Sequence, residues 1–454
     1  MIKKLLDYLP GNKRKKALPS QPKLNIIPRS EHHVSRNDIS DHALKVLYRL
    51  NKAGHEAYLV GGGVRDLLLH KHPKDFDIAT SASPEEVHNL FRNSRLIGRR
   101  FKLVHVLFGR EIIEVATFRG QHKEDDKHSA SSEEGMILRD NVYGTKEEDA
   151  LRRDFTVNAL YYCVKDFSIH DYANGLEDLN KKQLRLIGDP DTRYREDPVR
   201  MLRAVRFATK LDFDLEPSTA KPITELADLL AHIPSARLFE EVLKLFMSGH
   251  ALENFLMLRE LGLFKHLFPD ADACLNQNNE RDYRFIEIAL KNTDIRIKQD
   301  KPVTPAFLYS AFLWLPLQDE WQRSQKAGNS AFPALHMAAN KVIDRQTRAT
   351  SIPKRFGIPM KEIWEMQLRL PKRQGKRAEQ IASHPRFRAS YDFLLLREQS
   401  GENLDGLGQW WTDYQKSDAH SKRKLIKDTV PNGPRKRSRS RSGPRKKPGQ
   451  KPNQ

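Results

Sequence analysis

The sequence predicts an α+β protein: a mixed α/β head, all-helical neck and body domains, and disordered basic termini. Strand-like and helix-like segments alternate up to about residue 190, whereas helical periodicity alone continues from 197 to about 411. Polar, basic stretches without apolar periodicity lie at both ends. At roughly 100–200 residues per domain, 454 residues hold about three domains. We therefore expect a flexible basic arm (1–37), the head (38–190), the neck (191–270), the body (271–415) and a disordered tail (416–454).

The elements of the head follow from local patterns. A helix is expected from His42, because residues 38–40 can cap it and Leu44, Leu47 and Tyr48 recur at i, i+3 and i+4. The segments expected after it are a strand at 57–60, a helix at 64–69, a strand at 76–78, a helix at 84–91 and a hairpin of strands at 101–108 and 111–118. The hydrophilic stretch 121–134, between Gly120 and Gly135, is predicted to be a mobile loop.

The C-terminal half is predicted from helical stripes. Leu238, Val242, Leu245 and Phe246 recur at i, i+4, i+7 and i+8, which is the spacing of a helix face that packs on a core. In the arm before the head we expect one short helix at the start. The last residues, GPRKRSRSRSGPRKKPGQKPNQ, lack the apolar side chains that folding requires.

The composition limits the classes of function. Lys and Arg number 79 against 59 Asp and Glu, which gives a net charge of +20, and thirteen basic residues but one acid lie in 419–454. Such clustering indicates a polyanionic partner, either nucleic acid or an acidic membrane surface. Cys163 and Cys274 make neither a disulfide framework nor a thiolate zinc site, so a reducing, cytoplasmic environment is expected. No apolar stretch approaches the ~20 residues of a transmembrane helix, and no secretory signal is recognised.

Two aspartates are the first candidates for catalysis. Asp75 and Asp77 stand at i and i+2 of a predicted strand, so both point to one face while Phe76 and Ile78 point to the core. Adjacent carboxylates repel each other unless a cation lies between them. Magnesium prefers such hard oxygen ligands and leaves positions open for phosphate oxygens. A DxD pair alone also occurs at solvated strand ends, so its meaning depends on its neighbours.

A glycine triplet lies just upstream of this pair. Gly61, Gly62 and Gly63 allow backbone N–H groups to approach a phosphate closely, and Arg65 adds a positive charge. The spacing excludes the GxxxxGK[ST] of a P-loop and the GxGxxG of a dinucleotide-binding fold. A tight strand-to-helix turn would use the same glycines, and both interpretations hold together.

Two arginine-rich motifs complete a predicted nucleotide pocket. RRDFTVN places two guanidinium groups beside a carboxylate, Asp154. EDPVRMLRAVR opens a helix with Asp197 as the expected N-cap and with Arg200, Arg203 and Arg206 at i, i+3 and i+6, over about 120° of one face. Arginine rows also occur on solvated helices, but beside a carboxylate pair this one is better suited to a base edge and a triphosphate.

Four motifs carry a family resemblance. LVGGGVRD, DFDI, RRDFTVNALYY and EDPVRMLRAVRFA, in this order over residues 58–210, resemble the class II nucleotidyltransferases of the polymerase-β superfamily. That class holds the bacterial poly(A) polymerases and the tRNA CCA-adding enzymes. Within it, LIGRRFKLVH (96–105) is similar to a segment of the bacterial poly(A) polymerase I family, and the resemblance to that family covers most of 30–415. It implies a palm-like nucleotidyltransferase head.

The resemblance implies roles for individual residues. Asp75 and Asp77 correspond to the magnesium-binding catalytic pair. Asp154 corresponds to the third catalytic aspartate, and Glu114 on the strand 111–118 is its rival by analogy with the superfamily's palm. The implied nucleotide-binding residues are Gly62, Arg65, Arg153, Asp197, Arg200 and Arg203. The first two correspond to triphosphate contacts, the third to a sugar or phosphate contact, and Asp197 with Arg200 to the pair that reads the incoming base.

The implied reaction is attack of an RNA 3′-hydroxyl on the α-phosphate of ATP, with magnesium as cofactor and pyrophosphate as product. AMP residues would be added without a template, in mRNA polyadenylation and RNA turnover. Two alternatives stay open: a CCA-adding enzyme, which uses CTP and ATP and stops after three additions, and a catalytically inactive RNA-binding protein. LIGRRFKLVH and the basic tail disfavour the first, and the complete set of carboxylates disfavours the second.

Basic clusters in the C-terminal half are candidates for RNA contact. They comprise Lys372, Arg373, Lys376, Arg377, Arg386 and Arg388. Phe387, between the last two, is suited to stack on a base, although the same pattern occurs on solvated helices. The tail from Arg435 is expected to add salt-sensitive affinity. Docking to RNA-decay or RNA-chaperone proteins, or peripheral contact with anionic lipid, would give the same pattern of charge.

Overall fold

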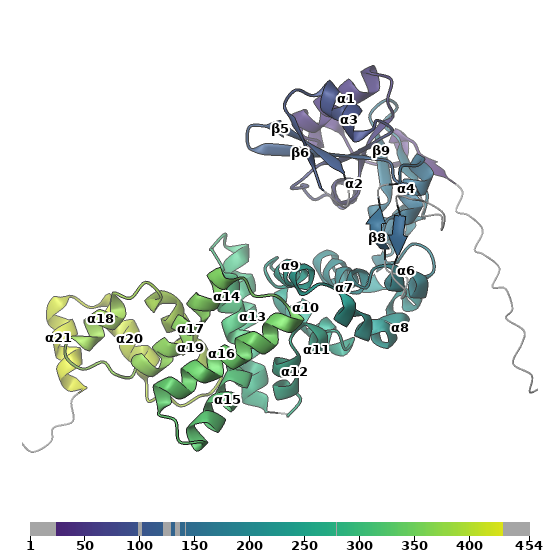
Figure 1. Ribbon diagram of the computed structural model, residues 1–454. Helices are drawn as coiled ribbons and strands as arrows, with labels where there is room; N and C mark the ends of the chain where they lie inside the picture. The colour runs from purple at the N-terminus through teal and green to yellow at the C-terminus, as the bar shows by residue number, and fades with distance from the viewer. Residues whose placement is uncertain are drawn as a thin grey trace, which may run out of the picture. The chain divides into compact units, whose positions relative to one another are not determined.

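The computed structural model describes residues 24–98, 102–120, 129–131, 137–140, 142–277 and 279–429. These residues form two compact units, which are described separately. Unit 1 comprises the described parts of Met1–Gln277, Leu290–Val303 and Ile343–Ile352, and unit 2 those of Asn278–Ala289, Thr304–Val342 and Pro353–Gln454. The sheet lies in the N-terminal part of the chain and helices make up the rest (Figure 1). The predicted α+β class, with a mixed head and helical domains, is confirmed.

The head, in unit 1, is built on an eight-stranded sheet with the order β1-β10-β9-β2-β3-β6-β5-β4. Its strands are β1 (Asn25–Ile27), β2 (Ala57–Val60), β3 (Asp77–Thr80), β4 (Ser94–Ile97), β5 (Leu103–Phe108), β6 (Glu111–Thr117), β9 (Leu160–Cys163) and β10 (Ile169–Asp171). Neighbouring strands are antiparallel, except that β3 and β6 are parallel. The central strand β2 is buried along its whole length because all of its side chains are apolar or aromatic. The expected hairpin is confirmed as β5 and β6.

Short helices cover this sheet. They are α1 (Asp41–Lys52), α2 (Gly62–Leu68), α3 (Pro84–Leu90), α4 (Lys146–Arg152) and α5 (Gly175–Asn180). The Ser40 side chain caps α1, as the sequence predicts, and Ser83 and Thr145 form capping boxes at α3 and α4. Helix α1 packs on β2 and β3, and α3 packs on β4 and β5 (Figure 1). Both helices also contact β6.

The neck of unit 1 is helical, as expected. Its helices are α6 (Pro190–Glu196), α7 (Val199–Leu211), α8 (Pro217–Leu226), α9 (Ser235–Phe246), α10 (Ala251–Glu260), α11 (Phe264–Leu267) and α12 (Pro269–Leu275). The predicted stripe on α9 is confirmed, since Leu238, Val242, Leu245 and Phe246 are all buried. One short parallel pair, β11 (Gln183–Leu184) with β12 (Asp214–Leu215), extends strand structure past the point where only helices were expected.

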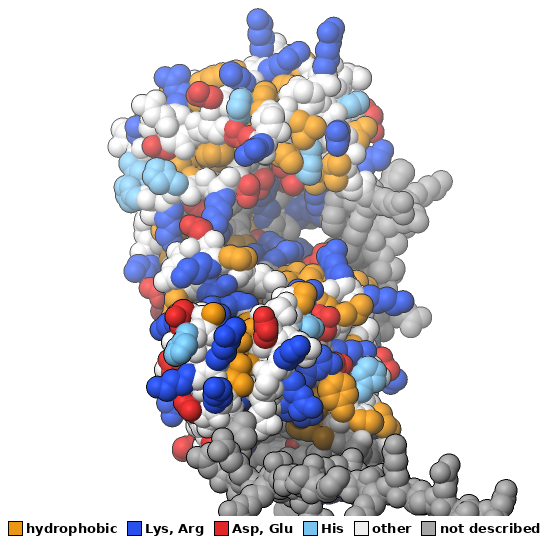
Figure 2. Space-filling view, turned by 90° about the vertical axis from the view of Figure 1, so that its left-hand side faces the viewer, with side chains coloured by type: hydrophobic (Ala, Val, Ile, Leu, Met, Phe, Trp, Pro, Cys, Tyr) orange, Lys and Arg blue, Asp and Glu red, His pale blue; other side chains and the backbone are white. Residues whose placement is uncertain are grey.

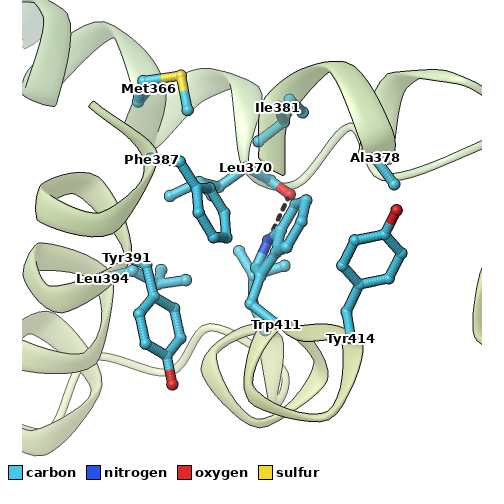
Figure 3. Packing of buried hydrophobic residues seen from close by; sticks show 10 residues of the cluster. Met366, Leu370, Ala378, Ile381, Phe387, Tyr391, Leu394, Trp411 and Tyr414 are labelled. Carbon is cyan, nitrogen blue, oxygen red and sulfur yellow. Dashed lines mark hydrogen bonds between the residues drawn. The ribbon is translucent and has the colours of Figure 1, made fainter. Parts of the chain in front are cut away.

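Unit 2 holds α14 (Pro305–Phe312), α15 (Trp314–Lys326), α17 (Lys354–Arg369), α18 (Arg377–Ala382), α19 (Phe387–Gln399), α20 (Leu407–Lys416) and α21 (Ala419–Asp428). Helices α13 (Glu280–Lys298) and α16 (Ala331–Ala349) contribute residues to both units. One core of unit 2 surrounds Trp411, whose indole N–H donates to the carbonyl of Leu370 at 3.1 Å (Figure 3).

Within the described ranges, no helix combines the length and apolar character needed to cross a bilayer.

Order extends further toward the N-terminus than predicted. The expected flexible arm 1–37 is wrong for residues 24–37, because β1 pairs with β10 and the side chains of Ile27 and Val34 are buried. Ser35 also forms a capping box for the short 3₁₀ turn Arg36–Asp38. A single three-residue strand has too little periodicity to be recognised in a sequence. The helix expected at the start of the chain lies outside the described residues.

The predictions for the tail and for the loop 121–134 also need correction. The tail expected to be disordered from 416 forms α21, which is capped by Asp418 and whose Leu425 and Ile426 pack against the core around Trp411. Within the loop lies β7 (Ser129–Ser131), which pairs with β8 (Ile137–Asp140) just after it. The other residues of that loop, and the tail from 430, lie outside the described residues.

Candidate active site

The turn from β2 to α2 depends on glycine at position 61. Gly61 has φ 69° and ψ −133°, a conformation that residues with a Cβ rarely adopt. A Cβ built on Gly61 would lie 3.3 Å from Nη1 of Arg153, and one on Gly62 would lie 3.4 Å from Nη2 of Arg65. The triplet therefore allows the backbone to approach two guanidinium groups closely.

Three carboxylates lie around the start of β3 and the middle of the neighbouring strand β6. Asp75 and Asp77 are exposed on either side of the buried Phe76, as the alternation predicts, although β3 begins only at Asp77. Glu114 is the residue opposite Asp77 in the parallel pairing of β3 with β6. Desolvation by the surrounding protein, together with the charges of Glu114 and Asp75, raises the pKa of Asp77 to about 6 against the opposing effect of Arg153. A bound cation would relieve this repulsion.

His105 extends this row of side chains and was not predicted from the sequence. It lies opposite Glu114 in the antiparallel pairing of β5 with β6, and its Nε2 is 3.5 Å from Oε2 of Glu114. Alternation along each strand places both residues on the more exposed face, but only the pairing register shows that they are neighbours. His105 is therefore the nearest described ionic partner of Glu114.

Asp154 is engaged away from this row. Its Oδ2 accepts hydrogen bonds from Nε and Nη2 of Arg203 at 2.8 and 2.5 Å, and its Oδ1 accepts one from Nδ2 of Asn158 at 3.2 Å. Burial acts to raise the pKa of Asp154, but Arg203 and the other donors hold it at about 2. The structure thus places Glu114 opposite Asp77 and pairs Asp154 with Arg203, and the assignment of the third catalytic carboxylate to either residue stays a prediction.

Arg65 is a buried residue with 2% of its side chain exposed. Its Nε and Nη2 donate to Oδ1 of Asp66 at 2.8 and 2.6 Å, and its Nη1 donates to Oδ1 of Asn158 at 2.6 Å. Asn158 in turn donates to Asp154. Arg65 therefore ties α2 to the RRDFTVN segment, and the direct contact with a triphosphate stays a prediction.

Arg153 belongs to a buried network that also contains Asp149 and Tyr161. Nε of Arg153 donates to the Tyr161 hydroxyl at 2.8 Å, Nη2 donates to Oδ2 of Asp149 at 3.1 Å, and the hydroxyl donates to the same oxygen at 2.5 Å. Burial opposes the charge, but Tyr161 and Asp149 raise the pKa of Arg153 overall. Asp149 stands four residues before Arg153, which is the one sequence signal for this pair.

Five arginines influence one another around α4, α6 and α7, and we call them the arginine cluster: Arg119, Arg152, Arg153, Arg193 and Arg200. Burial and the charges of the other four lower the pKa of Arg152 to about 9. Burial and Arg200 lower that of Arg193 to about 10. Glu196 accepts hydrogen bonds from both Arg193 and Arg200 at 2.8 Å. Such concentrated positive charge favours a polyanionic ligand.

Asp197 and Arg200 do not bond to each other through their side chains. Oδ2 of Asp197 accepts from Nη2 of Arg237 at 2.7 Å, while Arg200 bonds to Glu196 and to the carbonyl of Arg193. Helix α7 begins at Val199 rather than beside Asp197, yet Oδ1 of Asp197 accepts from the Val199 N–H at 3.3 Å. Arg237, on α9, was not predicted, because no local pattern relates it to Asp197.

The predicted RNA-contacting residues all lie in unit 2, but their surroundings differ. Lys372, Lys376 and Arg377 are exposed, whereas Arg373 lies 5.1 Å from the ring centroid of Trp410 and burial lowers its pKa. The face of the molecule in Figure 2 is rich in Lys and Arg side chains, with apolar side chains between them. The exposed residues of the first cluster are therefore the better candidates for phosphate contacts.

The second predicted cluster is held by acidic residues. Arg386 pairs with Glu362 at 2.9 Å, and Arg388 pairs with Asp392 at 3.0 Å. Phe387 is only 7% exposed, and its ring packs edge-to-face against Trp411 in the core (Figure 3). The expectation that Phe387 stacks on an RNA base is wrong, because its ring fills the space between helices.

Three family models match the chain. The "Poly A polymerase head domain" matches residues 57–185, the "Probable RNA and SrmB- binding site of polymerase A" matches 212–275, and the "Polymerase A arginine-rich C-terminus" matches 327–447. Poly(A) polymerase I of Salmonella typhimurium is 52% identical over 435 residues, which cover 94% of this chain and 93% of that protein. This chain belongs to the poly(A) polymerase I family. The resemblance carried by the four motifs is thereby confirmed.

Two further relatives differ in how much of this chain they cover. Poly(A) polymerase I of Haemophilus influenzae is 46% identical over 89% of this chain and 91% of its own length. The CCA-adding enzyme of Lactobacillus helveticus is 42% identical, but over 48% of this chain and 53% of that protein. Similarity to poly(A) polymerase I therefore covers nearly the whole chain, whereas similarity to this CCA-adding enzyme covers about half.

Solved structures share the fold of the chain. A tRNA-processing enzyme in its apo form I has a TM-score of 0.59 at 22% identity and covers 87% of this chain and 96% of its own. A Thermotoga maritima CCA-adding enzyme complexed with tRNA has a TM-score of 0.57 at 19% identity and covers 86% of both chains. These likenesses support the arrangement of a nucleotidyltransferase head followed by helical domains.

Proposed function

We propose that this protein is a polynucleotide adenylyltransferase that adds AMP residues from ATP to RNA 3′ ends without a template. Arg153, a member of the arginine cluster, acts electrostatically on Asp77 and lies beside the Gly61 turn, and Glu114 lies opposite Asp77; this arrangement carries the proposal. Carboxylates suit a divalent cation, and guanidinium groups suit a triphosphate. Membership of the poly(A) polymerase I family supports ATP and RNA as the substrates. The activity would serve mRNA polyadenylation and RNA turnover.

Asp75 and Asp77 are proposed to hold magnesium, with Glu114 as a third oxygen donor. The donor set fits this ion, because all three groups are carboxylates and their repulsion contributes to the raised pKa of Asp77. Among the described residues, no three potential ligands converge enough to enclose an ion, so we expect substrate oxygens to complete its coordination. Bound magnesium would lower the pKa of the attacking 3′-hydroxyl and neutralise the leaving pyrophosphate.

The triphosphate is assigned to the glycine turn and the arginine cluster. The backbone at Gly62 can approach a phosphate because no side chain intervenes. Tyr161 and Asp149 bind Nε and Nη2 of Arg153, and its Nη1 lies 3.3 Å from a Cβ built on Gly61, so we assign Nη1 to an anion at the turn. Arg65 would act by positioning the turn through Asp66 and Asn158, since its own guanidinium is buried.

Base selection is assigned to Asp197 and Arg200, with Arg203 beside them. An aspartate can accept from an exocyclic amine, and an arginine can donate two parallel hydrogen bonds. Arg237 and Glu196 hold these side chains through ion pairs. A base that left such groups unpaired would be rejected, so that protein side chains rather than a template select ATP.

The experiment is extension of a short RNA with a 3′-hydroxyl by the full chain, with magnesium and each NTP supplied singly. Long products with ATP alone, absent for Asp75→Ala, would support the proposal. Addition of CTP and then ATP to tRNA, with a stop at CCA, would instead identify a CCA-adding enzyme. RNA binding without extension by any NTP would identify a catalytically inactive RNA-binding protein.

A further inference from the structure

Unit 2 contains a pocket lined by its own residues, whereas the carboxylates of the head belong to unit 1. Its volume is about 180 Å³, and its lining comes from the end of α17, the turn after it, α18 and the turn before α19. The apolar lining residues are Met366 and Ile381. The polar lining residues are Arg369, Lys372, Arg377, Gln380 and His384. A pocket with three cations and an apolar wall can receive a ligand that is anionic on one side only.

The apolar wall is part of the core shown in Figure 3. Met366 and Ile381 belong to the same buried cluster as Leu370 and Trp411. The hydrogen bond from the Trp411 indole to the carbonyl of Leu370 ties the turn that carries Lys372 to α20. Because its wall belongs to a packed core, the pocket exists before a ligand arrives, which reduces the entropic cost of binding.

The cations of the pocket are less compensated than others in unit 2. Arg386, for comparison, has a carboxylate partner in Glu362 at 2.9 Å. Within the described part of the chain, Lys372 and Arg377 have no ion-pair partner, and Arg369 has one acidic neighbour on its own helix at 3.6 Å. Uncompensated cations around one pocket favour a phosphate group, which can accept from several of them at once.

Neutral hydrogen-bonding groups complete the lining. Nδ1 of His384 accepts from the backbone N–H of Arg386 at 3.1 Å, so a neutral ring carries its proton on Nε2 and presents a fixed donor there. Gln380 adds an amide that can both donate and accept. A ribose or a base, joined to a phosphate, would satisfy such a set better than an inorganic anion would.

We propose that this pocket binds one nucleotide of the RNA strand, with Arg369, Lys372 and Arg377 at its phosphates and with Gln380 and His384 at its sugar or base. Pockets that hold a whole small ligand usually measure roughly 300–1,000 Å³. The smaller volume here suits one unit of a longer strand rather than free ATP. The inference rests on the proposed function. It adds an RNA contact in unit 2, whereas the catalytic carboxylates belong to unit 1.

The test compares Lys372→Ala/Arg377→Ala with a matched control, Lys326→Ala/Lys416→Ala, which removes two exposed lysines from the same unit. Affinity of the full chain for a labelled single-stranded RNA is measured by fluorescence anisotropy over a range of salt concentrations. The pocket variant is expected to bind at least about 100-fold more weakly, because each of the two charge-assisted hydrogen bonds that it loses contributes about tenfold or more. The slope of log affinity against log salt should fall by about 1.4, at ~0.7 per phosphate contact. Affinity and slope equal to those of the control would overturn the proposal.

Kinetics distinguish RNA from free nucleotide as the occupant. The pocket variant should raise KM for RNA and leave KM for ATP and kcat at saturating RNA unchanged. A raised KM for ATP with unchanged RNA affinity would mean that the pocket takes free nucleotide, and the proposal would fail. Lys372→Arg/Arg377→Lys retains both charges and should restore binding; if it bound as poorly as the alanine variant, charge would not be the cause. RNA affinity is measured without ATP, so the pocket is tested even if the wild type transfers no AMP.

Discussion

Arg203 on α7 donates two hydrogen bonds to one carboxylate oxygen of Asp154, at 2.8 and 2.5 Å. These hydrogen bonds join α7, the second helix of the neck, to the RRDFTVN segment of the head, within unit 1. Arg153 and Arg200 lie on the same two segments and belong to the arginine cluster. The ion pair between Arg203 and Asp154 therefore positions the nucleotide pocket, although neither residue lies in the row of carboxylates on β3 and β6.

Asp154→Asn is expected to lower the free energy of unfolding by about 3 kcal/mol, the lower end of the range for breaking a buried ion pair, because a third of Arg203 is exposed. The folded-state pKa of about 2 lies below the usual 3.8, so the pair stabilises fully above about pH 4. That contribution is lost as pH falls from about 4 through about 2. Urea denaturation across this range measures both effects, and a variant with the acid sensitivity of the wild type would contradict them.

The variant Glu114→Gln tests whether Glu114 is a metal ligand or has only a structural role. If Glu114 is a metal ligand opposite Asp77, kcat should fall on the order of 100-fold or more, with little change in melting temperature because 44% of the side chain is exposed. His105→Gln should lower kcat less, since His105 would only orient Glu114. AMP incorporation and thermal denaturation are measured side by side. Full activity of Glu114→Gln would mean that another residue is the third metal-binding carboxylate.

Asp77→Asn should abolish AMP transfer and yet stabilise the metal-free protein at pH 7. The pKa of about 6 lies above the ordinary value, so the folded state binds the proton more tightly and loses stability as pH rises from about 4 to about 6. Solvent reaches Asp77, so we expect a gain of roughly 2–4 °C in Tm, equivalent to about 1 kcal/mol in a domain of 150–250 residues. Magnesium should raise Tm of the wild type and not of the variant. A lower Tm for metal-free Asp77→Asn would refute this reasoning.

Gly61→Ala is expected to cost about 1–3 kcal/mol of stability, because φ of 69° strains an alanine backbone. The new Cβ would also press on Nη1 of Arg153 at 3.3 Å, so KM for ATP should rise. Gly328→Ala is the matched control, since Gly328 has a positive φ of 94° with nothing within 4 Å of its added Cβ. Steady-state kinetics with varied ATP give the result. An unchanged KM for Gly61→Ala would exclude this turn from nucleotide binding.

Arg237→Ala tests how Asp197 is held. Without the 2.7 Å bond from Arg237, Asp197 should lose its fixed orientation, and the preference for ATP over CTP should fall by about tenfold. Separate measurement of kcat/KM for ATP and for CTP gives this ratio, and Arg237→Lys should recover part of it. A uniform loss for both nucleotides would indicate a structural role for Arg237 rather than base selection.

Local sequence patterns were sufficient to predict many of the secondary-structure elements and which of their residues are buried. The alternation in DFDI places Asp75 and Asp77 in solvent and Phe76 in the core, because strand periodicity depends only on neighbouring residues. The apolar stripe on α9 and the caps of α1 and α3 are equally local. The four motifs, taken together, were sufficient for the family. The boundaries expected at 190 and 270, and the roles of the nucleotide-binding residues, stay predictions.

Contacts between distant segments were decided only by the tertiary structure. The register of β3 against β6 brings Glu114 to Asp77, and the packing of α7 on the head takes Asp154 to Arg203. Phe387 looked available for RNA, but helix packing buries it. A sequence shows which side of its own strand or helix a residue occupies. Which residue lies opposite it depends on how separate strands and helices pair and pack. The free energy that favours one pairing arises only when the whole core assembles.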